Sequence, residues 1–150
     1  MPRLSLDSPV GRLTIFEQDG KITALVWGDK SAGPATPLLQ NAKRQLLAYF
    51  ERKRRDFDLP LLPEGTEDEK RIWAAMTAIP YGETRSYGEI GRALDIEPRA
   101  VGVACGRNPL PILLPCHRVT GADGKLVGYS GSGGIETKRK LLHLEGALLL

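Results

Sequence analysis

Cysteine and histidine are scarce in this chain, and their scarcity excludes several kinds of small protein. The 150 residues contain two cysteines, Cys105 and Cys116, and two histidines, His117 and His143. Two cysteines cannot build a disulfide framework, and two cysteines with two histidines so placed do not form a conventional zinc finger. We therefore expect reduced thiols and a cytosolic compartment, because disulfides are rare there.

Long apolar runs are also missing from the sequence. The run Ile112-Leu113-Leu114 is far too short to span a bilayer, and Met1 to Ser5 lacks the apolar stretch of a signal peptide. Hydrophobic residues make up 41% and charged residues 26%, which is ordinary for a globular protein. The net charge of +3 permits nucleic-acid binding but does not require it. We expect a cytoplasmic protein with no membrane partner.

The first 65 residues predict a small sheet and one helix. Positions 3–6 alternate weakly between apolar and polar residues, and short runs with β-branched and aromatic residues cover positions 12–17 and 21–27. Asp19-Gly20 between the last two runs indicates a hairpin turn. From Pro37 onward, apolar residues at spacings of three and four predict an amphipathic helix that ends in the basic run 52–55. Phe57 and Leu59 indicate one more strand before a linker.

Residues 66–150 predict a second domain that is mainly helical, so the chain as a whole is expected to be α+β. Helices are predicted over residues 67–79, 86–94, 97–106 and 136–144. Thr66 and Glu69 fit a capping box at the start of the first of these helices. Between the last two helices, Ile112 to Val119 is predicted as a short extended segment, followed by a glycine-rich loop.

The adjacent pair Cys116-His117 is the sharpest chemical feature of the sequence. A thiolate is a strong nucleophile, and a histidine can supply the base that forms it. Neighbouring residues of an extended segment point to opposite sides, so a bridging water is the simpler geometry for proton transfer. Glu145 is one candidate for a carboxylate that orients the imidazole. For a bare Cys-His pair, the commoner explanation is a buried cysteine that packs as a small hydrophobe.

The two helices over residues 86–106 are separated by a tight turn, which indicates either a helix-turn-helix or an αα-hairpin. The second helix begins near Arg99 and carries small residues at Ala100, Gly102, Ala104 and Gly106. Small side chains allow close approach to a DNA groove, and an arginine can reach phosphates or enter the base stack. Small side chains equally allow close packing of two helices, so this pattern alone does not distinguish a helix-turn-helix from an αα-hairpin.

Several motifs together resemble the O6-alkylguanine-DNA alkyltransferases, also called the methylated-DNA–protein-cysteine methyltransferases. The matching strings are Ile79-Pro80-Tyr81-Gly82-Glu83-Thr84, Ser86-Tyr87, Arg99-Ala100-Val101-Gly102, Asn108-Pro109, Pro115-Cys116-His117-Arg118-Val119, Gly128-Tyr129-Ser130-Gly131, Leu141-Leu142 and Glu145-Gly146. They cover about residues 66–146 in order, and the match before them is weaker. The resemblance implies a small N-terminal RNase H-like α/β domain, residues 1–65, and a C-terminal winged-helix-like helix-turn-helix domain, residues 66–150.

The same resemblance implies an enzyme that acts once. It would flip an alkylated base out through the minor groove of double-stranded DNA and transfer the alkyl group from O6 of guanine, with O4 of thymine as a further substrate, to Cys116. It implies no cofactor, and the zinc that some members hold in the N-terminal domain has no ligands here, since no Cys or His precedes residue 105. We expect a monomer in solution, associated with the nucleoid, with cooperativity on DNA left open.

The resemblance also implies a role for each matching residue. Cys116, His117, Glu145 and Tyr87 would be catalytic, with Tyr87 protonating the departing guanine at N3. Contacts with DNA would come from Ser86, Tyr87, Arg99, Ala100, Gly102 and Asn108. Arg99 would fill the gap left by the flipped base, and Asn108 would connect the recognition helix to the cysteine segment. The residues expected to line the base pocket are Pro111, Val119, Tyr129 and Ser130.

Three other functions are compatible with parts of the pattern. A non-catalytic alkylguanine-binding protein of the same fold would bind lesions without removing them, although the presence of Cys116 argues against it. A helix-turn-helix regulator would bind one operator sequence tightly and show no preference for alkylated DNA. A cysteine hydrolase would turn over an ester or a peptide, and it gives the helix-turn-helix no role.

Overall fold

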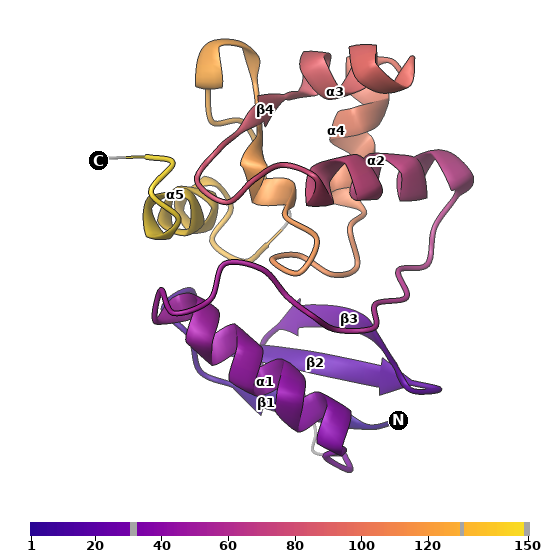
Figure 1. The fold of residues 1–150 in the computed structure, drawn as a ribbon, viewed down its shortest axis with the longest axis vertical. Helices are drawn as coiled ribbons and strands as arrows, with labels where there is room; N and C mark the ends of the chain where they lie inside the picture. The colour runs from indigo at the N-terminus through magenta and orange to yellow at the C-terminus, as the bar shows by residue number, and fades with distance from the viewer. Residues whose placement is uncertain (31–32, 130, 149–150) are drawn as a thin grey trace. The chain divides into compact units, whose positions relative to one another are not determined.

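The computed structural model describes residues 1–30, 33–129 and 131–148, which form two compact units, Met1–Glu64 and Gly65–Leu150. The first unit holds an antiparallel sheet and one helix, and the second is mainly helical (Figure 1). This arrangement confirms the α+β class. Among the described residues, no helix has the length and apolar character that crossing a membrane requires.

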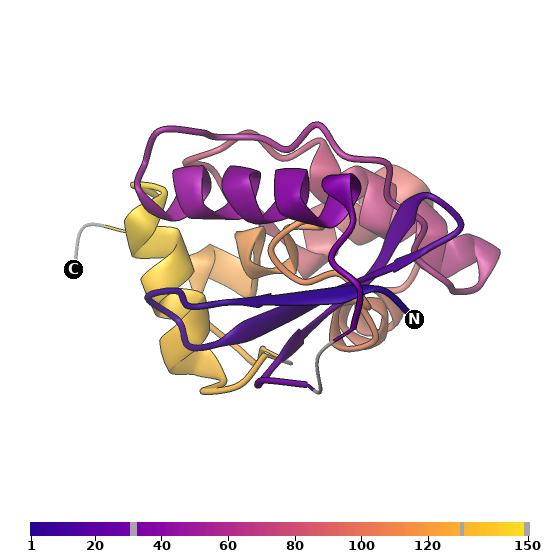
Figure 2. The same cartoon turned by 90° about the horizontal axis from the view of Figure 1, so that it is seen from below.

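The sheet of the first unit has the order β1-β2-β3. Its strands are β1 (Arg3–Leu6), β2 (Leu13–Gln18) and β3 (Lys21–Trp27). Asp19 and Gly20 join β2 to β3, and both have positive φ, 52° and 77°, as a tight hairpin turn of the right-handed twist requires. The helix α1 (Pro37–Phe50) lies along one face of this sheet (Figure 2). Its apolar stripe and the sheet's inward residues form the buried core of the unit.

Two predictions for the first unit are wrong in detail. The helix ends at Phe50 rather than in the basic run, and Arg52 has φ 61°, so the run 52–55 follows the helix and is not part of it. Phe57 and Leu59 do not form a strand. The sheet contact occurs two residues later, where Leu61 makes an isolated parallel bridge with Ile22. Prolines at 60 and 63 limit this segment to a single bridge, because proline cannot donate to a ladder.

The second unit is built around a helix-turn-helix. Its helices are α2 (Glu67–Thr77), α3 (Tyr87–Leu94), α4 (Pro98–Gly106) and α5 (Ile135–Leu144). Capping boxes fix the starts of α2, through Thr66 and Glu69, and of α3, through Ser86 and Glu89. The Trp73 indole of α2 donates to the Ala104 carbonyl of α4 at 2.9 Å, so these two helices are joined by a buried hydrogen bond as well as by packing.

A small parallel pairing connects the helix-turn-helix to the segment that follows Cys116. Strand β4 (Arg85–Ser86) pairs with β5 (Val119–Thr120), and two short 3₁₀ turns, η1 (Cys116–Arg118) and η2 (Ala122–Gly124), flank β5. This pairing places the start of α3 beside the residues after Cys116.

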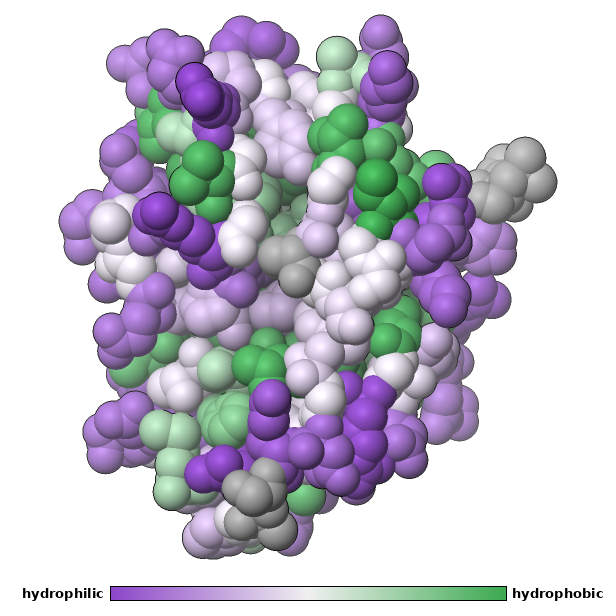
Figure 3. All heavy atoms as spheres, turned by 180° about the vertical axis from the view of Figure 1, so that it is seen from behind, coloured by the Kyte–Doolittle hydropathy of each residue, from purple (hydrophilic) through white to green (hydrophobic). Residues whose placement is uncertain are grey.

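Apolar side chains on the face of the molecule seen in Figure 3 form separate small patches among polar ones. The large hydrophobic residues that are exposed in the described part of the chain are Met1, Leu62, Val103, Val127 and Ile135. The other large apolar side chains that the structure describes are buried or half-buried, and the buried ones form the cores of the two units.

Candidate active site

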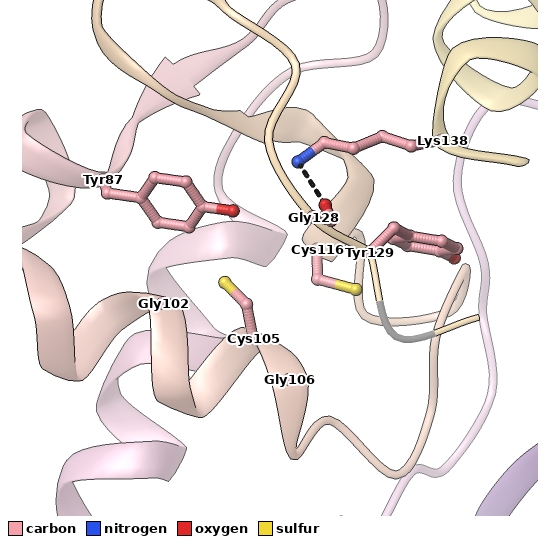
Figure 4. Close-up of a pocket in the computed structure, with 8 residues that line it drawn as sticks. All are labelled: Tyr87, Gly102, Cys105, Gly106, Cys116, Gly128, Tyr129 and Lys138. Atoms are coloured by element: carbon pink, nitrogen blue, oxygen red, sulfur yellow. Dashed lines mark hydrogen bonds between the residues drawn. The ribbon is translucent and has the colours of Figure 1, made fainter. Parts of the chain in front are cut away.

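A pocket of about 280 Å³ lies within the second unit, and Cys116 is one of the residues that line it (Figure 4). The other lining residues are Tyr87, Gly102, Cys105, Gly106, Gly128, Tyr129 and Lys138. They come from the start of α3, the C-terminal half of α4, the glycine-rich loop and α5. The pocket therefore brings the reactive thiol next to the helix-turn-helix.

Cys116 is held by a loop that Asn108 fixes at both ends. The Asn108 side-chain amide donates to the Leu114 carbonyl at 2.8 Å, and its oxygen accepts from the Leu110 backbone N–H at 2.8 Å. Within this loop Ile112 has φ 74°, a conformation that a β-branched residue rarely adopts. The buried Asn108 thus connects the end of α4 to the segment that carries the thiol.

The prediction of an extended segment up to Val119 is wrong. Cys116–Arg118 forms a 3₁₀ turn, in which the Arg118 N–H donates to the Pro115 carbonyl at 3.0 Å, and the strand begins only at Val119. The proline fixes its own φ and lacks an N–H, so a ladder cannot form through this position. The turn directs three successive side chains, Cys116, His117 and Arg118, to different sides of the backbone.

His117, Arg118 and Glu145 form a buried cluster behind Cys116. His117 Nε2 lies 2.7 Å from Glu145 Oε2, and both side chains are fully buried. Arg118 donates from Nε to Oε1 at 2.8 Å and from Nη2 to Oε2 at 3.0 Å. Burial alone would raise the pKa of Glu145, but the hydrogen bonds and charges of His117 and Arg118 outweigh it and lower this pKa to about 2. Glu145 is therefore a carboxylate at neutral pH.

The second imidazole nitrogen of His117 has no hydrogen-bond partner among the residues that the structure describes. Nδ1 is buried, with a surface too small for contact with bulk water. Buried polar atoms nearly always have a hydrogen-bond partner. A nitrogen without one, in the residue next to a cysteine, is therefore a candidate for binding a water molecule or accepting a proton.

The Cys116 thiol is held in its neutral form. Burial raises its pKa, while a hydrogen bond from the Asn108 side chain and the charge of Lys138 oppose this shift. Only 3% of the residue is exposed. A thiol in such surroundings needs a base at the moment of reaction.

Lys138 is the pocket residue that the sequence did not reveal. Its ammonium group donates to the Val127 and Gly128 carbonyls at 3.2 Å each and lies 5.7 Å from the centre of the Tyr87 ring (Figure 4). Burial lowers the pKa of Lys138. A signal was available in the helical pattern, because Lys138 precedes the core residues Leu141 and Leu142 by three and four positions and so shares their buried face.

The two pocket tyrosines and the second cysteine are neutral as well. Burial raises the pKa of Tyr87 to about 12, and the Tyr87 hydroxyl donates to the Val127 carbonyl at 3.3 Å. Burial raises the pKa of Tyr129 well above its usual value. Cys105 lies 3.6 Å from the Met76 sulfur, and burial raises its pKa to about 12. Cys105 thus packs in the core and also faces the pocket.

The remaining site residues proposed from the sequence lie outside this pocket. Arg99 and Ala100 are exposed on α4 and line a groove between α2 and α4. Ser86 accepts from the Glu89 N–H at 3.0 Å as the cap of α3 and lines a third hollow. Pro111 and Val119 are buried and do not line the pocket. Ser130 lies outside the described residues. Of the predicted set, the pocket therefore collects Tyr87, Gly102, Cys116 and Tyr129, with His117 and Glu145 in the buried cluster behind Cys116.

Metal ligation has no geometric support in the ranges that the structure describes. Within them, His, Cys, Asp and Glu side chains do not gather in groups of three or more that could hold an ion.

Comparison with known proteins gives a consistent result for both units. The family model described as "6-O-methylguanine DNA methyltransferase, ribonuclease-like domain" matches residues 3–63, and the one described as "6-O-methylguanine DNA methyltransferase, DNA binding domain" matches residues 67–147. Together these two matches cover nearly the whole chain.

Individual relatives match over nearly their full length. The methylated-DNA–protein-cysteine methyltransferase of Mycolicibacterium paratuberculosis is 45% identical, over 94% of this chain and 90% of that protein. The constitutive Bacillus subtilis protein of the same name is 42% identical, over 93% and 92%. The crystal structure of Mycobacterium tuberculosis OGT in complex with DNA has a TM-score of 0.87 at 43% identity, covering 98% of this chain and 94% of that one.

Proposed function

The chain belongs to the 6-O-methylguanine DNA methyltransferase family, and on this premise we propose that it repairs DNA by moving an alkyl group from O6 of guanine to Cys116. The observation that carries the proposal is the position of a buried thiol in a pocket next to a helix-turn-helix, with a buried His117–Glu145 pair behind it. The partner is double-stranded DNA that contains the lesion. The protein would work in the cytoplasm, on the DNA of the nucleoid.

The exposed edge of α4 supports approach of a DNA groove to this pocket. Arg99, Ala100, Val103 and Gly106 are all exposed there, and three of these four side chains are small or apolar. The reacting atom of a base is inaccessible inside a duplex, so the nucleotide must be extruded at a cost of a few kcal/mol. Insertion of Arg99 into the stack would offset part of that cost. The minor groove of DNA carries little sequence information, so a helix that binds there has no strong sequence preference, which suits a repair protein.

The chemical step is a displacement at the alkyl carbon. The Cys116 thiol gives its proton, through one water molecule, to His117 Nδ1, and its sulfur attacks the carbon. The S–C bond forms as the C–O6 bond breaks, and the guanine leaves with a proton supplied to N3 by Tyr87. The Tyr87 phenolate then regains a proton from solvent, as His117 releases the proton that it received from Cys116. Glu145 stabilises the imidazolium that results, as a carboxylate does in a nucleophile–base–carboxylate relay.

Lys138 and Tyr87 fit the charges that develop in this step. The Lys138 ammonium lowers the pKa of Cys116 by its charge and therefore favours the thiolate as it forms. Tyr87 is a neutral phenol with a pKa of about 12, so its hydroxyl carries a proton until the base leaves and can then supply it to N3. Tyr129 completes the lining of the pocket.

The product is a thioether, which is chemically stable. No residue of the described pocket is placed to remove an alkyl group from Cys116, so each molecule acts once. We therefore propose a stoichiometric reagent rather than a turnover enzyme.

Mass spectrometry after incubation with duplex DNA that carries one O6-methylguanine tests the proposal. We expect one methyl group per protein molecule, located on the Cys116 peptide, with an equal loss of methyl from DNA. Cys116→Ser should bind the lesion and transfer nothing, because a hydroxyl is a far weaker nucleophile. Cys105→Ser is the matched control, since it removes the other thiol of the same pocket, and it should still transfer.

The proposal is wrong if Cys116 remains unmodified under these conditions. Lesion binding without methyl loss would indicate a non-catalytic binding protein instead. Methyl transfer to Cys105 would assign the reaction to the other thiol.

A further inference from the structure

Arg118 follows the Cys116-His117 pair directly and is buried, which is unusual for an arginine. Its side chain is 9% exposed. Besides its two contacts with Glu145, it donates from Nη1 to the Ile79 carbonyl at 2.8 Å, and its guanidinium carbon lies 5.7 Å from the centre of the Tyr81 ring. Buried charges persist only when they are paired, so this arginine is held in one orientation by the carboxylate, the carbonyl and the ring.

We propose that Arg118 is a positioning residue that selects, through Glu145, the nitrogen of His117 that acts as the base. This inference rests on the proposed function for its meaning, but part of its test does not depend on alkyl transfer. Arg118 itself does not touch the pocket among the described contacts.

The first step of the argument is hydrogen-bond donation. An ionised carboxylate can only accept hydrogen bonds, and Arg118 contributes to keeping Glu145 ionised. His117 Nε2, 2.7 Å from Oε2, must then carry a hydrogen. In a neutral imidazole the other nitrogen has the lone pair, so Nδ1, the buried atom without a described partner, is the base.

The second step is the charge of the cluster. The charges of Arg118 and Glu145 are opposite, so the pair has no net negative charge that would hold a second proton on the His117 imidazole. The other ionisable groups near the cluster are Tyr81, whose ring faces the Arg118 guanidinium, Cys116 and Tyr129, both with a pKa raised by burial, and Lys138, whose charge acts on the thiol. Without Arg118, a carboxylate would be buried with no cation beside it.

Such a carboxylate with an imidazole beside it takes up a proton. The proton would reside on His117, because an imidazole binds a proton more tightly than a carboxylate does. His117 would then be unable to receive the proton of Cys116 until the pH is raised. The charge balance of the cluster, rather than its shape alone, would set the pH at which the protein reacts.

The test compares the single-turnover rate of methyl transfer against pH for the wild type, Arg118→Gln and Arg118→Lys. For Arg118→Gln we expect the acidic limb of the profile to shift to higher pH by about one to three units. At pH values below the limb, transfer should then be about 10- to 1,000-fold slower than in the wild type. Arg118→Lys keeps the charge and should return the limb to its wild-type position. Arg139→Gln, on the exposed face of α5, is the matched control and should leave the profile unchanged.

A second readout is the imidazole ¹⁵N spectrum of unreacted protein. His143 is exposed and is the only other histidine, so it serves as an internal reference. At neutral pH, the wild type should show His117 protonated at Nε2 alone, and Arg118→Gln should show it protonated at both nitrogens. This result is expected whether or not the protein transfers methyl groups, so it separates failure of this inference from failure of the proposed function.

An Arg118→Gln profile that is lowered at every pH, with its limb in the wild-type position, would overturn the proposal and leave Arg118 a structural role. So would a wild-type His117 that carries its hydrogen on Nδ1. If Arg118→Gln does not fold, the double variant Arg118→Gln/Glu145→Gln removes both charges and leaves neither unpaired. Its overall rate should fall, since the imidazolium loses Glu145, but its limb should not lie above that of the wild type. An upward shift of the limb would contradict the charge argument.

Discussion

At the scale of single residues, the site separates a nucleophile that is kept neutral from a carboxylate that is kept charged. Burial acts in the same direction on both groups, since it raises the pKa of Cys116 and would raise that of Glu145. Only Glu145 has hydrogen bonds strong enough to reverse the shift, from His117 and Arg118. The thiol therefore stays protonated until a substrate and a base are both in place.

The depressed pKa of Glu145 predicts how stability depends on pH. Its folded-state pKa is about 2, against about 4.3 for a free glutamate, so its contribution is complete above about pH 5 and is lost as the pH falls toward 2. At pH 7 we expect Glu145→Gln to lower the free energy of unfolding by about 3 kcal/mol, because Arg118 is left buried without its anion. At about pH 3 the difference between the variant and the wild type should narrow, as measured by urea unfolding.

Glu136→Gln provides the comparison for this prediction, since Glu136 lies in the first turn of the same helix with its side chain 71% exposed. It should change stability by no more than about 0.5 kcal/mol at either pH. If Glu145→Gln costs the same at both pH values, the carboxylate does not titrate as the structure implies.

Residue identity along the chain predicts part of this site and not the rest. Cys116 and His117 could be named because the string Pro-Cys-His-Arg-Val is specific, and Glu145 because the Glu145-Gly146 match follows it in order. The structure brings His117 Nε2 and Glu145 Oε2 to 2.7 Å. Lys138 and Arg118 could not be assigned, because what matters is their partners. The partner of Arg118 lies 27 positions away along the chain, and no local pattern encodes that contact.

At the scale of helices and strands, local patterns predict the helices of the second unit to within two residues at either end, and they predict irregular backbone less well. The capping box at Thr66 and Glu69 and the Asp19-Gly20 turn were both predicted, because each depends on a few neighbouring residues. The end of α1 at Phe50 and the 3₁₀ turn at Cys116–Arg118 were not. Each depends on contacts across the unit, such as the loop that Asn108 holds.

The turn between α3 and α4 depends on a glycine inside a helix. A Cβ atom at Gly91 would lie 2.4 Å from the Ile96 carbonyl oxygen and 3.4 Å from the Pro98 nitrogen, and both belong to the backbone of the turn. We expect Gly91→Ala to force the turn open, to lower the free energy of unfolding by about 1–3 kcal/mol and to weaken lesion binding, because α4 would move. Urea unfolding and a DNA titration measure the two effects.

Gly88 of the same helix is the matched control. A Cβ atom there would come within 3.4 Å only of the mobile end of Arg92, so Gly88→Ala should be neutral or stabilising by up to about 1 kcal/mol. Equal changes in the free energy of unfolding for the two variants would contradict the role given to the close approach at Gly91.

At the scale of the whole molecule, the charge is modest for a protein that acts on DNA. A net charge of +3 gives a weak general attraction to phosphates. Preference for damaged sites must therefore come from the pocket and from the exposed edge of α4, where the base and the gap it leaves are bound. The protein then binds undamaged DNA loosely enough to leave it, which a molecule that reacts once requires.

If the exposed edge of α4 fills the gap left by the base, two arginines of this region should differ in how their substitution by alanine changes lesion binding and the rate of transfer. Arg99 is proposed to fill the stack, whereas Arg107, just past the C-terminal end of α4, has an exposed side chain that lies 3.7 Å from Glu69. Arg99→Ala should weaken lesion binding and also slow transfer at saturating protein about 5- to 30-fold, because base extrusion loses about 1–2 kcal/mol of compensation. Arg107→Ala removes the same charge and should leave the saturated rate unchanged.

Rapid-quench transfer assays measure the rate at saturating protein, and binding titrations at several salt concentrations measure lesion binding. Loss of a phosphate contact lowers the salt slope by about one, and an inserted side chain should lower it by much less. A wild-type saturated rate for Arg99→Ala would remove Arg99 from the flipping step and leave it a contact with phosphate alone.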